Sequence, residues 1–160
     1  MVKNSKNLLI KFIFLVSIIA LVSAFFIEYI LGHQPCNLCI LERIPYFLAI
    51  IVILLNYKFI EFEKFFILFL TIIFLFGTVL SLYHLGIEQG LIQESLVCDL
   101  KSGSNLLSKE EILKQLQEKS VSCKDVTFKI FGLSLTSYNI LISLIITISA
   151  GKIYFNYDKN

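Results

Sequence analysis

Four cysteines are the residues of this sequence whose chemistry is most informative. Cys36 and Cys39 form a C-x-x-C motif, whereas Cys98 and Cys123 lie 25 positions apart. Two thiols three positions apart at the start of a helix can close a small disulfide, and a helix N-terminus stabilises a thiolate. Arg43 follows Cys39 by four residues, so its permanent charge would favour a nearby thiolate or an anion developing on a bound acceptor. The pattern predicts thiol–disulfide chemistry.

Both cysteine pairs also have purely structural interpretations. The C-x-x-C could be a static disulfide or half of a zinc site, but zinc would need a second closely spaced pair, so we expect no metal. A disulfide between Cys98 and Cys123 would either brace a long loop or offer an exposed bond to another protein's thiolate. The polar residues 99–107 fit an exposed bond. From the residues alone, both interpretations of this second pair stay open.

The overall composition indicates that membrane helices position these residues. Hydrophobic residues make up 57% of the 160 residues and charged residues 16%, against about 25% charged in a typical soluble domain. A globule of this size cannot bury so many apolar side chains, so the surplus must face lipid. The net charge of +2 gives no basic face for nucleic acid, and the apolar content excludes a disordered chain.

Four stretches are apolar enough to cross a bilayer, which needs roughly 20 residues of helix. We therefore expect an all-α integral membrane protein, a four-transmembrane-helix bundle forming a single domain over residues 1–160. The expected spans are 8–31, 38–57, 65–85 and 130–150, with loops at 32–37 and 86–129.

The second span is the least regular of the four. Its uncharged part, residues 44–57, is too short to cross the hydrocarbon core, so the span must extend back to residue 38. That extension draws Cys39, Glu42 and Arg43 into the membrane edge and leaves Pro45 in the first turns, where proline does least harm.

The first span begins like a secretory signal, with lysines before an apolar run and a Val22-Ser23-Ala24 sequence that would suit a signal peptidase. The apolar run continues past Ala24 to Ile30, so we expect the span to be retained.

Charge and parity together predict the orientation. Lysine and arginine are equally numerous on the two faces, but they are denser on the face with both termini, which we expect to be cytoplasmic. With four spans, the first and third loops share the other face, so all four cysteines lie on one side of the membrane. Two cysteine pairs on one face fit an oxidising compartment.

We expect the long third loop to contain a short helix of its own. Ser108 to Glu111 is typical of a capping box, and Ile112, Leu113 and Leu116 then share one face. The helix either lies in the membrane interface or packs on the bundle from water, and both alternatives fit the sequence.

A redox protein of this kind needs an electron acceptor. The sequence contains no G-x-G-x-x-G motif and no cysteine run of the iron–sulfur type. A lipid-soluble acceptor such as a quinone fits a thiol pair at the membrane edge. His84, at the end of the third span, is expected at the same depth as the C-x-x-C motif and Arg43, although each of these residues alone could be an ordinary interfacial side chain.

Three stretches of the sequence resemble one known family. Pro35 to Arg43 is similar to the P-C-x-L-C-x-x-E-R signature of the disulfide bond formation protein B (DsbB) family. Tyr83 to Gly90 resembles its Y-H-x-G-x-E-x-G stretch, and Phe131 to Asn139 resembles the segment that opens its last span. The resemblance covers essentially the whole chain.

This resemblance implies a multi-pass protein of the bacterial inner membrane that reoxidises a periplasmic DsbA-like thioredoxin-fold protein and reduces ubiquinone or menaquinone. Cys36 and Cys39 would be the quinone-coupled pair, with the Cys39 thiolate against the quinone ring. Arg43, and less directly His84, would bind the quinone. Cys98 would form the mixed disulfide with the partner, and Cys123 would be its bonded neighbour.

Three other functions remain as alternatives. The chain could be a specialised branch of the family with one dedicated partner. It could be a structural membrane protein whose disulfides only brace the loop, or a protein that senses or transports metal.

Overall fold

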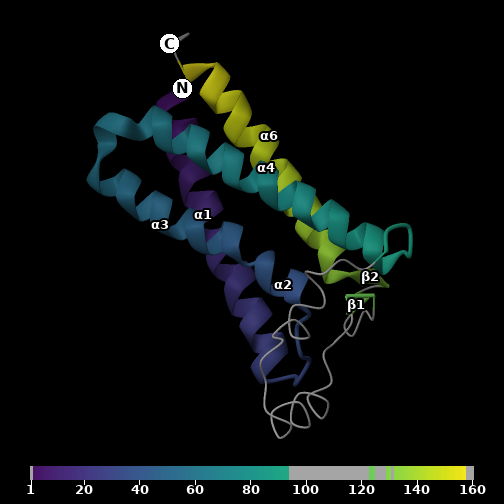
Figure 1. Ribbon diagram of the computed structural model, residues 1–160. Helices are drawn as coiled ribbons and strands as arrows, with labels where there is room; N and C mark the ends of the chain where they lie inside the picture. The colour runs from purple at the N-terminus through teal and green to yellow at the C-terminus, as the bar shows by residue number, and fades with distance from the viewer. Residues whose placement is uncertain (1, 94–122, 125–128, 131, 158–160) are drawn as a thin grey trace, which may run out of the picture.

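The computed structural model describes residues 2–93, 123–124, 129–130 and 132–157. Its elements, labelled in Figure 1, are α1 (Val2–Tyr29), α2 (Asn37–Leu41), α3 (Ile44–Lys58), the 3-10 helix η1 (Ile60–Phe62), α4 (Glu63–Glu88), β1 (Lys129–Ile130), β2 (Leu133–Ser134) and α6 (Leu135–Phe155). Cys98 and the helix expected after Ser108 lie outside the described residues, so those two predictions stay predictions.

The outer surface of the helices is apolar. Four helical segments are long and apolar enough to cross a membrane: Lys6–Tyr29, Asn37–Lys58, Ile60–Glu88 and Leu135–Phe155. Large side chains such as Val22, Phe76 and Ile145 are more than half exposed. Exposed apolar surface on this scale is stable against lipid and not against water. The prediction of an all-α, multi-pass membrane protein is confirmed.

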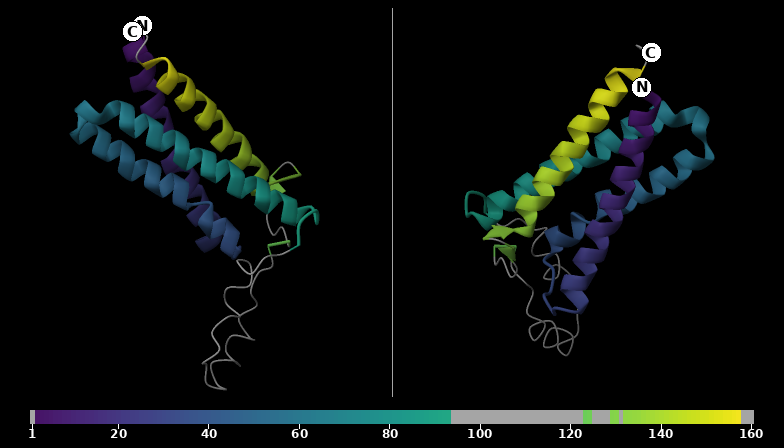
Figure 2. Two further views of the ribbon diagram at one scale, coloured as in Figure 1. Left: turned by 45° about the horizontal axis from the view of Figure 1, so that its top comes forward. Right: turned by 180° about the vertical axis from the view of Figure 1, so that it is seen from behind.

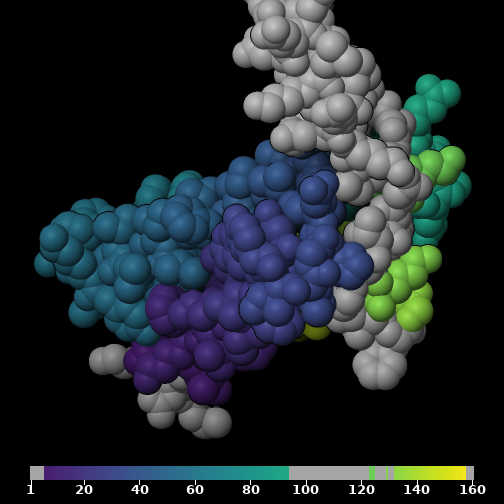
Figure 3. Space-filling model, turned by 90° about the horizontal axis from the view of Figure 1, so that it is seen from below, coloured from purple at the N-terminus to yellow at the C-terminus, as the bar shows by residue number. Residues whose placement is uncertain are grey.

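The helices place both chain termini at one end of the bundle. Helices α4 and α6 run side by side, while α1 packs on α3 and α3 on α4 (Figures 1 and 2). At the terminal end, Lys6 forms an ion pair with Glu63 at 3.0 Å, and the Tyr157 hydroxyl donates to the same carboxylate at 3.0 Å. The α1–α2 connection and the β1–β2 hairpin lie at the opposite end (Figure 3).

Small residues allow α3, α4 and α6 to approach one another closely. A Cβ atom on Gly77 of α4 would lie 3.2 Å from the Pro45 side chain of α3 and 3.8 Å from the Ser143 hydroxyl of α6. Small residues at helix contacts are typical of membrane bundles, where packing rather than the hydrophobic effect drives association. The main cluster of buried apolar side chains includes Ile53 of α3, Phe74 of α4 and Ile146 of α6.

The second membrane segment is divided rather than continuous. The structure contains the five-residue α2 and then α3, separated at Glu42 and Arg43, where the sequence predicted one helix over 38–57. The break places Pro45 in the first turn of α3, a position that requires no backbone N–H. It also turns the Glu42 side chain into the bundle, where it is 8% exposed.

The last helix begins later than hydropathy indicates. Strands β1 and β2 pair as a short antiparallel hairpin, in which Lys129 pairs with Ser134 and Ile130 with Leu133. Gly132, with φ +82°, supplies the left-handed turn conformation. The Ser134 hydroxyl then accepts the backbone N–H of Ser137 and caps α6. Hydropathy places the start at residue 130, since an apolar hairpin and an apolar helix have the same composition.

Candidate active site

The two thiols of the C-x-x-C motif lie against each other at the start of α2. Their sulfur atoms are 2.8 Å apart, and both cysteines are free. Cys36 is the N-cap of α2, and its sulfur accepts the backbone N–H of Cys39 at 3.3 Å. The three-residue spacing therefore brings the sulfurs together by local structure alone.

His84 of α4 approaches the same pair from a neighbouring helix. Its side chain is almost fully buried, with Nε2 3.5 Å from the Cys36 sulfur and Nδ1 2.7 Å from Glu42 Oε1. The sequence predicted that His84 would share the depth of the thiols. The structure adds that it contacts Cys36 in particular.

The charge distribution of the pair favours a thiolate on Cys36. The hydrogen bond from the Cys39 thiol lowers the pKa of Cys36 to about 5; burial opposes this change, and the hydrogen bond and charge of His84 reinforce it. A thiolate is the nucleophilic form of cysteine, so this environment favours the nucleophilic form of Cys36 at neutral pH.

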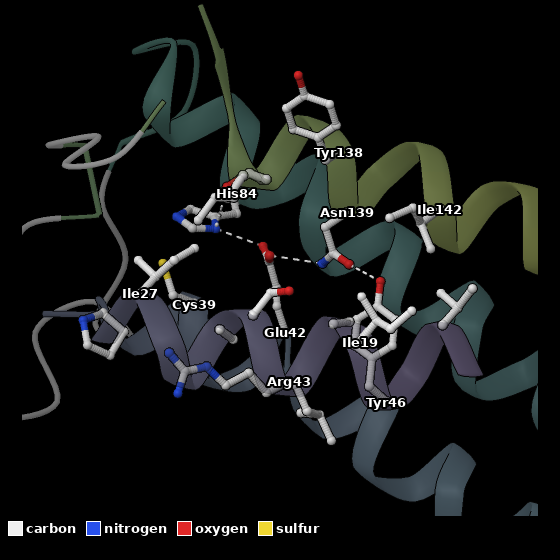
Figure 4. Close-up of a pocket in the computed structure, with 18 of the residues that line it drawn as sticks. Ile19, Ile27, Cys39, Glu42, Arg43, Tyr46, His84, Tyr138, Asn139 and Ile142 are labelled. Carbon is white, nitrogen blue, oxygen red and sulfur yellow. Dashed lines mark hydrogen bonds and ion pairs between the residues drawn. The ribbon is translucent and has the colours of Figure 1, made fainter. Parts of the chain in front are cut away.

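A row of buried polar side chains continues from His84 across the bundle. The Asn139 side-chain amide donates to Glu42 Oε2 at 2.9 Å and to the Ser81 hydroxyl at 2.7 Å. The Tyr46 hydroxyl donates to the amide oxygen of Asn139. Figure 4 shows this row running from His84 through Glu42 and Asn139 to Tyr46.

A second carboxylate lies on the other side of the imidazole. Thr136 of α6 donates its hydroxyl hydrogen to Glu88 at 2.6 Å, and its oxygen is 3.3 Å from His84 Nδ1. Glu88 Oε1 is also 3.8 Å from His84 Nε2. One buried imidazole thus lies between two acidic groups from two different elements.

Arg43 lies beside the thiols but is already paired. Its guanidinium is 2.5 Å from the Glu28 carboxylate of α1 and lies over the Phe25 ring at 5.2 Å. The sequence predicted a charge near the thiols, and the structure shows which acidic group balances it.

A cavity of about 480 Å³ connects these groups, and its volume lies within the range of small-molecule sites. Its lining includes the thiols, Glu42, Arg43, His84 and Glu88 at the polar end. Apolar side chains of α1 and α6, such as Ile19, Ile27 and Ile142, line the remainder (Figure 4). Such a cavity accepts an apolar molecule with a few polar atoms at one end.

Cys123, near the C-terminal end of the long third loop, lines the same cavity. It is buried, is disulfide-bonded and packs in one cluster with Cys36, Leu38 and Ile87. Three of the four predicted site cysteines therefore gather around one cavity, and Cys98 lies outside the described residues.

Cys36, Cys39 and His84 have ligand atoms within 4.8 Å of one another, so they are also the nearest approach to a metal site in the described part of the chain. Two thiolates on a tetrahedral zinc ion, with Zn–S of about 2.3 Å, lie about 3.8 Å apart. The observed 2.8 Å between the sulfurs is too short for that arrangement.

Sequence reasoning missed the residues that support the site rather than those that react. Tyr46 lies outside the three stretches that resemble the family, and Thr136 and Asn139 lie within the third. Their contacts form only in the tertiary structure: Thr136 meets His84, Asn139 meets Glu42, and Tyr46 meets Asn139. Glu28 and Glu42 could have been found, because a carboxylate within an apolar span marks a functional position by default.

The fold and site define a multi-pass membrane protein with a closely spaced pair of free thiols beside an apolar cavity. The family model for disulfide bond formation protein DsbB matches residues 6–152, so the chain belongs to the DsbB family. An uncharacterized protein of Rickettsia prowazekii (strain Madrid E), RP370, is 34% identical over 150 residues, which is 91% of this chain and 85% of that relative. Family membership makes this protein a membrane disulfide-generating oxidoreductase.

Proposed function

We propose that this protein reoxidises a DsbA-like thioredoxin-fold dithiol protein and passes the electrons to membrane quinone. One observation supports this function above the others. A reactive thiol pair, an arginine and a disulfide-bonded cysteine line one cavity whose remaining wall is apolar. A structural protein needs only the disulfide, whereas an electron relay needs all of these groups at one place.

The cavity fits a quinone on chemical grounds. A quinone has two polar carbonyl oxygens on a small ring and an apolar tail, which match the polar and apolar ends of the cavity. Arg43 and Cys39 would hold the ring, and the bound quinone supplies a two-electron acceptor. Such an acceptor is required because DsbA-type disulfides are strongly oxidising, near −120 mV, whereas structural disulfides are typically below about −300 mV.

The two cysteine pairs have different reaction partners: Cys98 and Cys123 exchange with the protein partner, and Cys36 and Cys39 pass electrons to the membrane quinone. A partner thiolate attacks Cys98 and breaks its bond, for which we assign Cys123 as the other member, and Cys123 leaves as a thiolate. Cys123 then attacks Cys36 of the oxidised C-x-x-C pair, forming a Cys36–Cys123 bond and releasing Cys39 as a thiolate. The packing of Cys123 against the Cys36 cluster supports this step. The second partner thiolate then attacks the bond to Cys98, which closes the partner's disulfide and releases the Cys98 thiolate. Cys98 attacks Cys123, which restores the Cys98–Cys123 bond and leaves Cys36 and Cys39 reduced.

The location follows from the chemistry. We place the protein in the bacterial inner membrane, with both termini in the cytoplasm and the four cysteines on the periplasmic face, where disulfides persist.

Thiol trapping in intact cells tests the proposal. Cells are acid-quenched, free thiols are alkylated with a mass tag, and free cysteines are counted with and without quinone synthesis. We expect an oxidised protein in normal cells and accumulated free thiols when quinone is absent. Four cysteines that stay oxidised in both conditions would instead indicate bonds that only brace the loop.

A further inference from the structure

In the row of polar side chains beside the thiols, Glu42, Asn139 and Tyr46 have no role in the function described so far, and His84 has only the weaker expectation of binding the quinone. His84 and Glu42 are 1% and 8% exposed, and both lie within segments that cross the membrane. Burying ionisable groups away from water is unfavourable unless they are paired. Their presence at this depth therefore calls for a function as well as a partner.

The contacts of His84 show which ring nitrogen carries the hydrogen in the neutral imidazole. The other nitrogen can then accept the proton of the Cys36 thiol. Nδ1 lies between Glu42 Oε1 and the Thr136 oxygen, and the Thr136 hydrogen is already directed to Glu88. Both neighbours of Nδ1 are therefore acceptors, so Nδ1 carries a hydrogen. In the neutral imidazole, Nε2 then has a free lone pair directed at the Cys36 thiol, 3.5 Å away.

We propose that His84 holds the Cys36 proton while the thiol pair is reduced, with Glu42 balancing the resulting charge, and releases that proton into the cavity when the disulfide closes. The inference rests on the proposed function for the fact that the pair cycles. It assigns His84 to proton transfer with Cys36, and it assigns Glu42, Asn139 and Tyr46 to positioning.

The step balances in atoms and electrons. In the reduced pair, one proton is on His84 and one is on the Cys39 sulfur. Closing the disulfide forms one bond between the two sulfurs and releases two electrons, which go to the quinone of the proposed function. The protons from His84 and Cys39 leave into the same cavity, where reduction of a quinone to a quinol consumes two.

Asn139 and Tyr46 orient the Glu42 carboxylate so that one of its oxygens is available to His84. The Tyr46 hydroxyl donates to the amide oxygen of Asn139, so the amide must present its nitrogen to Glu42. This bond occupies Oε2 and leaves Oε1 for the imidazole. The described titratable and charged groups that line the cavity around His84 are His33, Cys36, Cys39, Glu42, Arg43, Tyr46, Glu88 and Tyr138.

The chain has only two histidines, so the protonation of His84 can be observed directly. We would label histidine with ¹⁵N, purify the full chain free of quinone in detergent, and record imidazole spectra at pH 7 with the pair oxidised and reduced. A His33→Gln variant assigns the signals. We expect His84 to carry one proton in the oxidised protein and two in the reduced protein. The same protonation state in both would overturn the proposal.

Alkylation of the reduced pair provides a second test that also needs no quinone. The rate of single alkylation, followed by intact mass, should reach half its plateau near pH 5 in the wild type. Glu42→Gln cannot balance an imidazolium, so we expect about tenfold slower alkylation at pH 6, which corresponds to a pKa two units higher. Glu61→Gln, an identical change in the exposed η1 helix, should leave the profile in place.

These outcomes separate the proton inference from the proposed function. Redox-dependent protonation of His84 in a protein that does not reduce quinone would support the inference and refute the function. An unchanged alkylation profile in Glu42→Gln would refute the role of Glu42. If that variant does not fold, the spectra of the wild-type protein still decide the question.

Discussion

At the scale of single residues, the two thiols of one motif have different environments. Cys36 caps α2, receives the Cys39 N–H and faces His84, whereas Cys39 lies one turn further into the membrane segment. Cys36 is therefore the stable thiolate of the reduced pair. Cys39 becomes a thiolate when Cys36 is bonded to Cys123 or when the Cys39 proton leaves into the cavity, and we assign this form of Cys39 to the quinone.

Cys98→Ser should abolish oxidation of the protein partner and leave the chain folded in the membrane, because only a sulfur can form the mixed disulfide. The measurement is the redox state of the DsbA-like partner in cells carrying the variant. Ser104→Ala, in the same loop, should have no effect. A Cys98→Ser protein that sustains the normal rate would exclude the assigned role.

Arg43→Ala should raise the apparent KM for quinone about tenfold or more, since hydrogen bonds to a charged group contribute about 1.5–3 kcal/mol. Its KM for the protein partner should change less. Steady-state kinetics with each substrate varied in turn give both values, and Lys152→Ala at the opposite end is the control. Equal quinone dependence in Arg43→Ala and wild type would remove Arg43 from the site.

At the scale of elements, the site depends on interruptions in the regular helices. The break between α2 and α3 turns Glu42 toward His84, and the hairpin before α6 places Thr136 in its first turn. The close approach at Gly77 holds α3, α4 and α6 at the spacing that these contacts require.

Gly77→Val should destabilise the protein by about 1–3 kcal/mol, because its side chain would overlap Pro45 in a packed contact. Thermal unfolding in detergent measures the loss. The matched variant Gly151→Val should lose less, since a Cβ there meets its nearest neighbour, Thr71, at an ordinary 3.8 Å. Equal losses at both positions would show that the Gly77 contact is not tight.

The sequence allowed the helical class and the contact between the two thiols to be predicted, but not the surroundings of that thiol pair. Apolar runs specify spans, and the three-residue spacing of Cys36 and Cys39 specifies their contact locally. The Glu42–Asn139 contact joins residues 97 positions apart, and no local pattern encodes such a pairing. The α2–α3 break was missed because both halves are equally apolar.

At the scale of the whole molecule, the even number of spans and the shared end of the two termini separate two faces. The thiols, Cys123 and the hairpin lie toward one face, and the Lys6–Glu63 pair lies at the other. Our proposed orientation makes the thiol face periplasmic.

A fluorescent protein fused to the C-terminus should fluoresce in cells if that terminus is cytoplasmic. Such a protein folds in the cytoplasm, but it does not become fluorescent when it is exported unfolded. Alkaline phosphatase fused at the same position should be inactive. Loss of fluorescence together with an active phosphatase would reverse the orientation and move the cysteines to the reducing side.

Some residues that line the cavity are also exposed to lipid, and this has a consequence for how a reactant reaches the site. Phe12, Ile19 and Ile145 line the cavity and are also about half exposed on the surface that faces lipid. A reactant entering there diffuses in two dimensions and never passes through water. Its effective concentration is then a mole fraction in the bilayer. Diluting proteoliposomes with buffer at a constant concentration of the protein partner should leave the turnover per enzyme unchanged. Fusing them with empty vesicles should slow the turnover in proportion to the added lipid.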